Sequence, residues 1–223
     1  MGQPIVFPDQ TVMLPIQFFG SIDYYAVTAA YGTVLIDDTA RFDKRFKSAH
    51  RTTIADTRGL LQMTVPTAKQ SNQGRPLLWS DIPLSEHGHW WDVHFESIAS
   101  AYGRTPFFEF YADRLRAFFS PSAVTRFSSV AEYDRAINKA VCGLLGLENR
   151  IIYISEQPDC RNMTLNANFT GVGYAGIPES VTPVEYYQVR SAKFGFLAGL
   201  SILDLLCNMG PESVVVLTQM MRQ

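Results

Sequence analysis

Residues 12–38 contain two apolar runs separated by a helical pattern, and this order constrains the fold more than any other feature of the chain. The runs VMLPIQFF (12–19) and TVLIDD (33–38) are predicted strands. Between them, SIDYYAVTAAY (21–31) is a predicted helix with Ser21 as its N-cap. A strand, a helix and a second strand predict a parallel pair, because parallel neighbours need a crossover.

The chain after residue 38 extends this unit into a larger α/β fold. Gly20 and Gly32 are predicted turn residues on either side of the first helix. The later predicted elements are a hairpin at 50–67 that turns at DTRG, a helix at 90–102 closed by Gly103 and Pro106, helices within 105–120 and 129–147, a buried strand at 150–157, a Gly- and Asn-rich loop at 166–176, a strand VEYYQVR at 184–190 and a helix from Ser201. We expect a single domain over residues 1–223, with a Rossmann-like, largely parallel sheet that is flanked by helices and carries an inserted β-hairpin.

The composition narrows the classes of partner. A formal net charge of −2 over 223 residues gives no overall attraction to nucleic acid or to an anionic membrane surface. No stretch approaches the ~18 apolar residues of a membrane span, and the start of the chain lacks the basic and apolar regions of a signal peptide. Three widely spaced cysteines fit free thiols in a reducing compartment. We therefore expect a cytoplasmic protein with a small-molecule substrate and with no cofactor, nucleic acid partner or membrane span; a homo-oligomer is left open.

Three of the four histidines lie in the stretch HGHWWDVH, at positions 87, 89 and 94. This spacing could bind a metal ion, but Glu86 and Asp92 are the only nearby residues that could complete a ligand set, and no familiar zinc spacing results. His87 and His89 precede the predicted helix and are expected to be exposed. We therefore expect no structural metal at this cluster.

The helix at 90–102 carries two rows of side chains at helical spacing. One row is apolar and predicted to be buried, and it contains Trp91, Phe95, Ile98 and Tyr102. The neighbouring row contains Trp90, His94, Ser97 and Ala101, which places His94 beside the buried face. Such a histidine could act as a general base or hydrogen-bond a ligand, and the alternative is a packing residue.

Other polar groups lie where predicted strands end, which is where α/β folds bind ligands. The sequence QFFGS contains Gln17 and places Gly20 before the first helix. The loop DDTARFDKRFKSAHR concentrates positive charge, as either an anion site or a solvated surface. The residues concerned are Arg41, Lys44, Arg45, Lys47 and Arg51 on this loop, and Ser155, Glu156, Asp159 and Arg161 at and after the end of the strand at 150–157.

The last predicted helix, in LSILDLLCNMGP, has a polar row on an otherwise apolar surface. Ser201, Asp204 and Asn208 share this face. Buried polar groups need partners. Ser201 and Asp204 have the spacing of a capping box, and ligand contact is the alternative.

Several segments occur together in the order seen in one known family. They are FFGSIDYYAVTAAY, HR at 50–51, VPTAK at 65–69, WWDVHFESIASAYGRTPFFEFYAD, DCR at 159–161, YYQV and LSILDLLCNMGP. In these segments the chain resembles the WbqC-like family over nearly its whole length. The matching positions are Gly20, Tyr24, Tyr25, Arg51, Lys69, Trp90, His94, Tyr102, Pro106, Arg161, Gln188, Asp204, Asn208 and Gly210, and the chain departs from the pattern at His50, Cys160, Ala198, Gly199 and Met209.

The resemblance implies a role in surface-polysaccharide synthesis, because the family is known chiefly from polysaccharide and O-antigen gene clusters and a glycine transferase activity has been suggested for it. The leading hypothesis is therefore the transfer of a glycyl or other small acyl group onto an amino sugar. His94 would be the base, and Lys69 and Arg51 would bind an anionic part of the acyl donor or of a nucleotide sugar. We expect these three side chains to share one pocket with the tyrosines of the first helix. The substrate-binding candidates are Gln17, Gly20, Tyr24, Tyr25, Trp90, Arg161, Gln188, Asp204 and Asn208.

Two other classes of function stay open. One is a protein without catalytic activity that binds a nucleotide sugar or another anionic small molecule. The other is nucleotidyl transfer, which needs a pair of carboxylates to hold a metal ion. Asp37 and Asp38 are the only candidate pair, and adjacent strand residues face opposite ways. In the binding protein, the rings that would stack on the ligand are Trp90, Trp91, Tyr24 and Tyr25.

Overall fold

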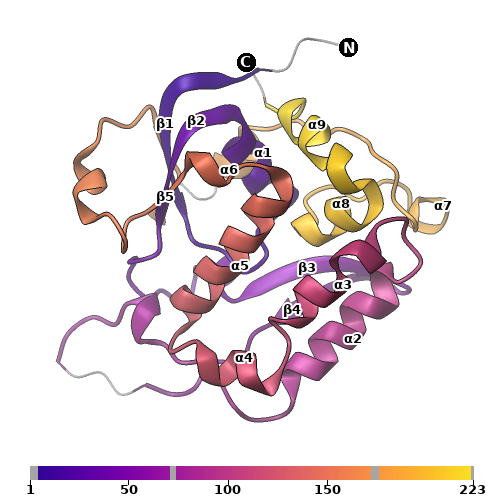
Figure 1. Ribbon diagram of the computed structural model, residues 1–223, viewed down its shortest axis with the longest axis horizontal. Helices are drawn as coiled ribbons and strands as arrows, with labels where there is room; N and C mark the ends of the chain where they lie inside the picture. Colours follow the sequence, from indigo (N-terminus) through magenta and orange to yellow (C-terminus); the bar gives the residue numbers. More distant parts are fainter. Residues whose placement is uncertain (1–4, 71–73, 172–175, 222–223) are drawn as a thin grey trace.

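The computed structural model describes residues 5–70, 74–171 and 176–221 and has an α/β fold (Figure 1). Within these residues, four parallel strands form one sheet in the order β5-β2-β1-β6, and two antiparallel strands form a separate hairpin. The sheet contains β1 (Phe7–Pro15), β2 (Tyr31–Asp37), β5 (Ile151–Tyr153) and β6 (Ala167–Asn168), and the hairpin contains β3 (Arg51–Asp56) and β4 (Gly59–Thr64). The predicted fold class, a parallel sheet flanked by helices with an inserted hairpin, is confirmed.

The sheet begins with the predicted strand, helix and strand. Helix α1 (Ile22–Ala30) connects β1 to β2, and the Ser21 hydroxyl caps it by accepting a hydrogen bond from the Tyr24 N–H at 3.2 Å. Alternate residues of both strands, such as Val12 and Val34, face the main core. Met13 and Leu35 point to the other face, where a small apolar cluster with Ile154 covers the sheet.

Three of the predicted boundaries are wrong. The strand expected at 12–19 runs from Phe7 to Pro15, and the strand expected at 150–157 is only Ile151–Tyr153. Gly32 lies inside β2 and not in a turn after the helix, because β1 passes so close that a Cβ at Gly32 would stand 1.7 Å from the Pro8 carbonyl oxygen. Close packing of two strands, rather than a turn, requires this glycine.

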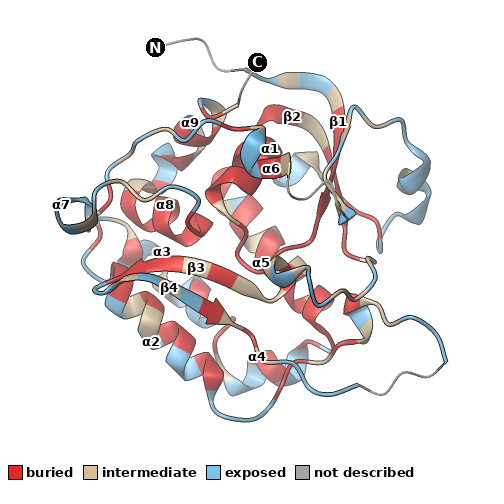
Figure 2. Ribbon diagram, turned by 180° about the vertical axis from the view of Figure 1, so that it is seen from behind, coloured by how far each residue is buried: buried red, intermediate tan, exposed pale blue. Residues whose placement is uncertain are grey.

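Three of the four helices between the hairpin and β5 form within the ranges predicted from apolar periodicity, and the short helix at 121–126 was not predicted. The four between the hairpin and β5 are α2 (Trp90–Tyr102), α3 (Phe108–Arg116), α4 (Pro121–Arg126) and α5 (Val130–Leu145). The apolar stripe predicted on α2 is buried, since its four side chains are at most 8% exposed. Helix α5 begins at the Ser129 N-cap and ends at Gly146, which has a left-handed conformation. Figure 2 shows the buried sides of these helices in red, turned towards the interior of the molecule.

The C-terminal part adds short helices and no strand at 184–190. These helices are α6 (Gly176–Glu179), α7 (Ser191–Phe194), α8 (Ile202–Met209) and α9 (Ser213–Thr218), and residues 172–175 of the predicted loop lie outside the described residues. The strand prediction at 184–190 is wrong because backbone and side chains there bond to side chains of α8. The Val189 N–H, for example, donates to Asn208 Oδ1 at 3.0 Å. No helix in the described ranges is long and apolar enough to cross a membrane.

Candidate functional site

A small polar pocket lies where β1 ends and α1 begins. Its volume is about 140 Å³. Three separate parts of the chain line it: the β1–α1 loop, the start of β3 with the 3-10 helix η1 (Lys47–Ala49), and the segment before α8. The lining residues are Gln17, Phe19, Gly20, Ser21, Ser48, Arg51, Thr52, Thr53, Gly199 and Ser201. We call this the polar pocket, and three of the predicted site residues, Gln17, Gly20 and Arg51, meet in it.

Backbone hydrogen bonds hold the three segments together. The Phe18 N–H donates to the Ser48 carbonyl at 2.9 Å, which joins the β1–α1 loop to η1. The Ser201 N–H donates to the Thr53 carbonyl at 2.8 Å, and the Ile202 N–H donates to the Gly20 carbonyl at 2.9 Å. The pocket is therefore built by the fold and not by one flexible loop.

The polar pocket contains polar atoms that have no partner among the described residues. They are Gln17 Nε2, Ser48 Oγ and Arg51 Nε, all buried as atoms. Gln17 is 3% exposed, so its amide cannot turn to bulk water. Because buried donors without partners are costly, these groups indicate space for a polar ligand or ordered water. Two of the three are donors only, and the N-terminus of α1 adds further positive potential, so the pocket favours an anion or a carbonyl oxygen.

The shape of the pocket depends on two neighbouring residues with unusual constraints. At Gly20 a Cβ would lie 3.0 Å from the Tyr24 ring and 3.2 Å from Gln17 Oε1, so a side chain there would displace the amide. Phe19 has a φ of 39°, a left-handed value that is unfavourable for a bulky residue. Its carbonyl accepts hydrogen bonds from Thr52 Oγ1 at 2.8 Å and Ser201 Oγ at 3.0 Å, and these offset the strain.

A buried carboxylate stands behind one wall of the pocket. Asp23, in the first turn of α1, is 7% exposed, and its Oδ1 has no partner among the described residues. Burial raises the pKa of this carboxyl above its usual value. A Cβ at Gly199 would lie 3.7 Å from Asp23 Oδ2, so the carboxylate lies next to a residue that lines the pocket.

His94 does not line the polar pocket. It lies in the core, 7% exposed, among the rings of Phe18, Trp90 and Phe119 at centroid distances of 5.2 to 6.3 Å. Burial lowers the pKa of His94 to about 4, and a hydrogen bond to the Thr64 backbone opposes this shift. Since Thr64 pairs with Arg51 in the hairpin, His94 and Arg51 approach the same strand position but do not share the pocket.

The other residues of the predicted shared pocket also lie elsewhere. Lys69 is exposed on the loop after β4. Tyr24 and Tyr25 are fully buried, and the Tyr25 hydroxyl accepts a hydrogen bond from Asn138 Nδ2 at 3.1 Å. Trp90 is buried and donates to the Ser85 carbonyl at 2.7 Å. With Trp91, which is 5% exposed, these rings are packed in the protein interior and offer no open face on which a sugar or a base could stack.

The carboxylates at the end of β2 are neutralised by arginines. Asp37 Oδ1 accepts from Arg161 at 3.0 Å, and Asp38 Oδ2 accepts from Arg135 at 3.1 Å. Ser155 also donates to Asp38, at 2.5 Å. The two acids face different partners, as alternation along a strand predicts, and their ion pairs leave neither oriented towards a shared metal ion. In the described part of the chain, no group of three His, Cys, Asp or Glu side chains is arranged to hold a metal ion.

The polar row of α8 forms a buried network. Asp204 is 2% exposed and accepts hydrogen bonds from the Tyr186 hydroxyl at 2.5 Å and from Gln188 Nε2 at 3.1 Å. Asn208 donates to the Asp204 carbonyl at 2.8 Å. Ser201 caps the helix, but the Asp204 carboxylate bonds to this network and not to the cap, so the predicted capping box does not form. These residues hold the 184–190 segment against α8.

The histidine cluster and the basic loop separate in the fold. His87 and His89 are exposed, whereas His94 is buried. On the basic loop, Arg45 forms an exposed ion pair with Asp43 at 2.7 Å. Arg51 is the one cation of that loop among the residues that line the polar pocket. The sequence did not single out Ser48 or Asp23, because neither belongs to a recognisable motif and only the tertiary contacts bring them to the pocket.

The sequence pattern of the WbqC-like protein family matches residues 16–172. This range is more than half of the chain, and the protein therefore belongs to the WbqC-like family. It includes Gln17, Gly20, Ser48 and Arg51, whereas Gly199 and Ser201 lie outside it. No curated protein and no solved structure gives a significant match to the chain.

Proposed function

We propose that this protein transfers a glycyl or other small acyl group to the amine of an amino sugar in surface-polysaccharide synthesis, and that the polar pocket binds the acyl group. The observation that carries the proposal is the pocket itself, near the N-terminus of α1, with the donors Gln17 Nε2 and Arg51 Nε, which have no partner in the described part of the chain. The role suggested for the WbqC-like family supports the same chemistry.

The volume of the pocket selects the substrate group. A pocket of about 140 Å³ is close to the ~150 Å³ cavity that holds a benzene molecule, so a glycyl or acetyl group fits and a nucleotide sugar does not. The amino sugar would then approach from the mouth. For this reason the pocket favours small-acyl transfer over the binding of a whole nucleotide sugar.

In the proposed reaction the sugar amine attacks the acyl carbon. A new C–N bond forms, the bond to the donor's leaving atom breaks, and the leaving group departs with its electron pair. Arg51 and Gln17 would donate hydrogen bonds to the acyl oxygen as negative charge develops on it. We assign acceptance of the amine proton to Asp23 and not to His94, because the Asp23 carboxylate lies next to Gly199, which lines the pocket, and burial raises the pKa of this carboxyl above its usual value.

The proposal is tested with an activated glycyl donor and a nucleotide-linked amino sugar, with the glycylated sugar detected by mass spectrometry. Arg51→Gln should abolish product formation, while Arg45→Gln, a change to an exposed arginine of the same loop, should not alter it. Asp23→Asn should lower kcat more than it raises KM. Absence of product from the unchanged protein, or equal activity of the Arg51 and Arg45 variants, would refute the proposal.

A further inference from the structure

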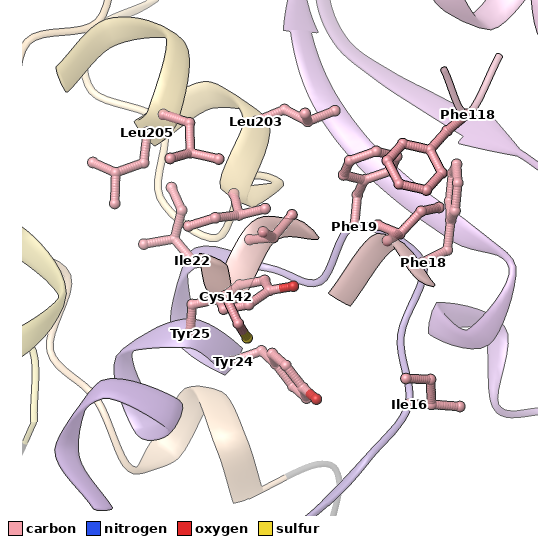
Figure 3. Packing of buried hydrophobic residues seen from close by; sticks show 14 of the residues in the cluster. Ile16, Phe18, Phe19, Ile22, Tyr24, Tyr25, Phe118, Cys142, Leu203 and Leu205 are labelled. Carbon is pink, nitrogen blue, oxygen red and sulfur yellow. The ribbon is translucent and has the colours of Figure 1, made fainter. Parts of the chain in front are cut away.

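A second pocket, larger and apolar, lies on the other side of Phe19. Its volume is about 540 Å³, within the range of ligand-binding pockets. Helix α5 forms one wall, with Ile137, Val141 and Leu144 at helical spacing, and Leu115 and Phe118 come from the opposite wall. Figure 3 shows the rings of Phe18, Phe19 and Phe118 gathered together. We call this the apolar pocket.

Phe19 belongs to both pockets. Its backbone carbonyl is held by Thr52 and Ser201, which line the polar pocket, while its ring contacts Phe119 and Phe118 at centroid distances of 5.8 and 6.5 Å. The left-handed φ of 39° gives this residue an unusual backbone path at the boundary. Phe19 therefore lines both the apolar pocket and the polar pocket.

Among the described residues, the charged side chains that line the apolar pocket are the cations Arg114, Arg126 and Lys139, with no Asp or Glu. Lys139 is neutralised by Glu156 at 2.6 Å. Within the described residues, Arg114 and Arg126 have no carboxylate at ion-pair distance, and the Arg126 guanidinium lies over the Phe127 ring at 4.3 Å. The lining therefore fits an occupant that combines apolar surface with negative charge.

We propose that the apolar pocket binds the chain of a single-chain amphipathic anion, such as an alkyl phosphate, with its head group between Arg114 and Arg126. A nucleotide base or a sugar has polar ring atoms that need hydrogen-bond partners, but the uncharged side chains that line the pocket present aliphatic and aromatic carbon. This inference goes beyond the proposed acyl transfer and does not depend on it.

The test measures binding of decyl phosphate to the full chain by calorimetry, below the concentration at which the probe forms micelles. We expect one molecule bound per chain, and little or no binding of decyltrimethylammonium, which has the same chain and the opposite charge. Arg114→Glu with Arg126→Glu should weaken binding by about tenfold or more, because both head-group contacts become repulsive. Equal binding of the two amphiphiles, or of wild type and this double variant, would overturn the proposal.

A second pair of variants tests the position of the chain. At Gly143, which lines the apolar pocket, a Cβ would meet nothing within 4 Å, so a side chain can enter the open space. Gly143→Phe should abolish decyl phosphate binding, and Gly143→Ala, which also replaces the glycine in the helix but adds only a methyl group, should keep it. Arg51→Gln should leave this binding unchanged, which separates a failure of this proposal from a failure of the acyl-transfer proposal. Retained binding in Gly143→Phe, or loss in Arg51→Gln, contradicts the placement.

Discussion

His94 shows how burial, more than sequence context, decides the chemistry of a side chain. Its ring is enclosed by Phe18, Trp90 and Phe119, and the cost of placing a charge there lowers its pKa to about 4. At neutral pH it is therefore an uncharged group of the aromatic core. The sequence left a base and a packing residue as alternatives, and this environment favours packing.

The lowered pKa of His94 predicts a pH dependence of stability. Below pH 6.5 the unfolded chain protonates His94, whereas the folded protein resists protonation until the pH approaches about 4. The contribution of His94 to the free energy of unfolding is therefore complete above pH 6.5 and is lost as the pH falls towards about 4. The loss should be roughly 3 kcal/mol, from ~1.4 kcal/mol for each pKa unit. Urea denaturation of the wild type and of His94→Phe at several pH values measures it. Wild type should lose more stability than the variant between pH 7 and pH 4; parallel curves would show that His94 titrates normally.

Asp134 of α5 predicts the opposite pH dependence. It is fully buried, neither carboxylate oxygen has a partner among the described residues, and burial raises its pKa well above the ordinary value. Above pH 3.8 the unfolded chain loses the Asp134 proton, whereas the folded protein keeps it. The free energy of unfolding therefore falls as the pH rises above 3.8. The melting temperature of Asp134→Asn should therefore be higher than that of the wild type at pH 7, and the difference should be smaller at pH 4. A difference that does not change with pH would contradict this.

At the scale of elements, the longer helices α1, α2, α3, α5 and α8 could be predicted because their signals are local, whereas the short helices α4, α6, α7 and α9 were not predicted. Ser21 and Ser201 cap α1 and α8 as expected, and Ser129 and Gly146 stand at the two ends of α5. The strand boundaries could not be predicted, because pairing decides them. The strand β5 is limited to the three residues that pair with β2, and β1 starts at Phe7 because Tyr31 pairs with it there. The segment 184–190 has the composition of a strand but pairs with no strand among the described residues.

The two glycines of β2 and α5 form a matched pair for a stability measurement. Gly32→Ala should destabilise the fold by about 2 kcal/mol or more, because the new Cβ would collide with the Pro8 backbone and force β1 away from β2. Gly143→Ala should stabilise it by ~0.5 to 1 kcal/mol, because the Cβ enters open space and alanine favours a helix. Thermal and urea unfolding of both variants would show the opposite signs, and a neutral Gly32→Ala would contradict the close packing of the strands.

At the scale of the molecule, the polar pocket shows what the sequence could not reveal. The carboxyl edge of the sheet was predicted as the place for a ligand, and Gln17, Gly20 and Arg51 do meet there. Lys69 and His94 do not line the pocket, because the hairpin turns Arg51 towards it while α2 buries His94 in the core. Gly199 and Ser201 lie about 150 residues after Arg51 and about 180 residues after Gly20 along the chain, and hydrogen bonds that no local pattern predicts bring them to the pocket.

The same long-range contacts predict that the sheet, the hairpin and the C-terminal helices unfold together as one domain. One continuous apolar cluster includes residues of β1, β3, α2, α5 and α8, so removal of any one element would expose the faces of the others. Probes lie in separate parts of the structure. Trp90 and Trp91 report on α2, Trp79 reports on the loop that packs against Phe42 and His50, and the buried thiols of Cys142 and Cys207 report on α5 and α8.

In a Cys160→Ser background, which removes the half-exposed thiol, tryptophan fluorescence, far-UV circular dichroism and labelling of the two buried thiols should give the same urea midpoint. The coincidence is expected because Ser201 bonds to the hairpin through Thr53 and caps α8, so α8 cannot separate while β3 stays folded without breaking buried hydrogen bonds. Labelling of Cys207 at a lower urea concentration than the fluorescence change would show instead that the C-terminal helices form an independent unit. The polar pocket would then lie between two units that can separate.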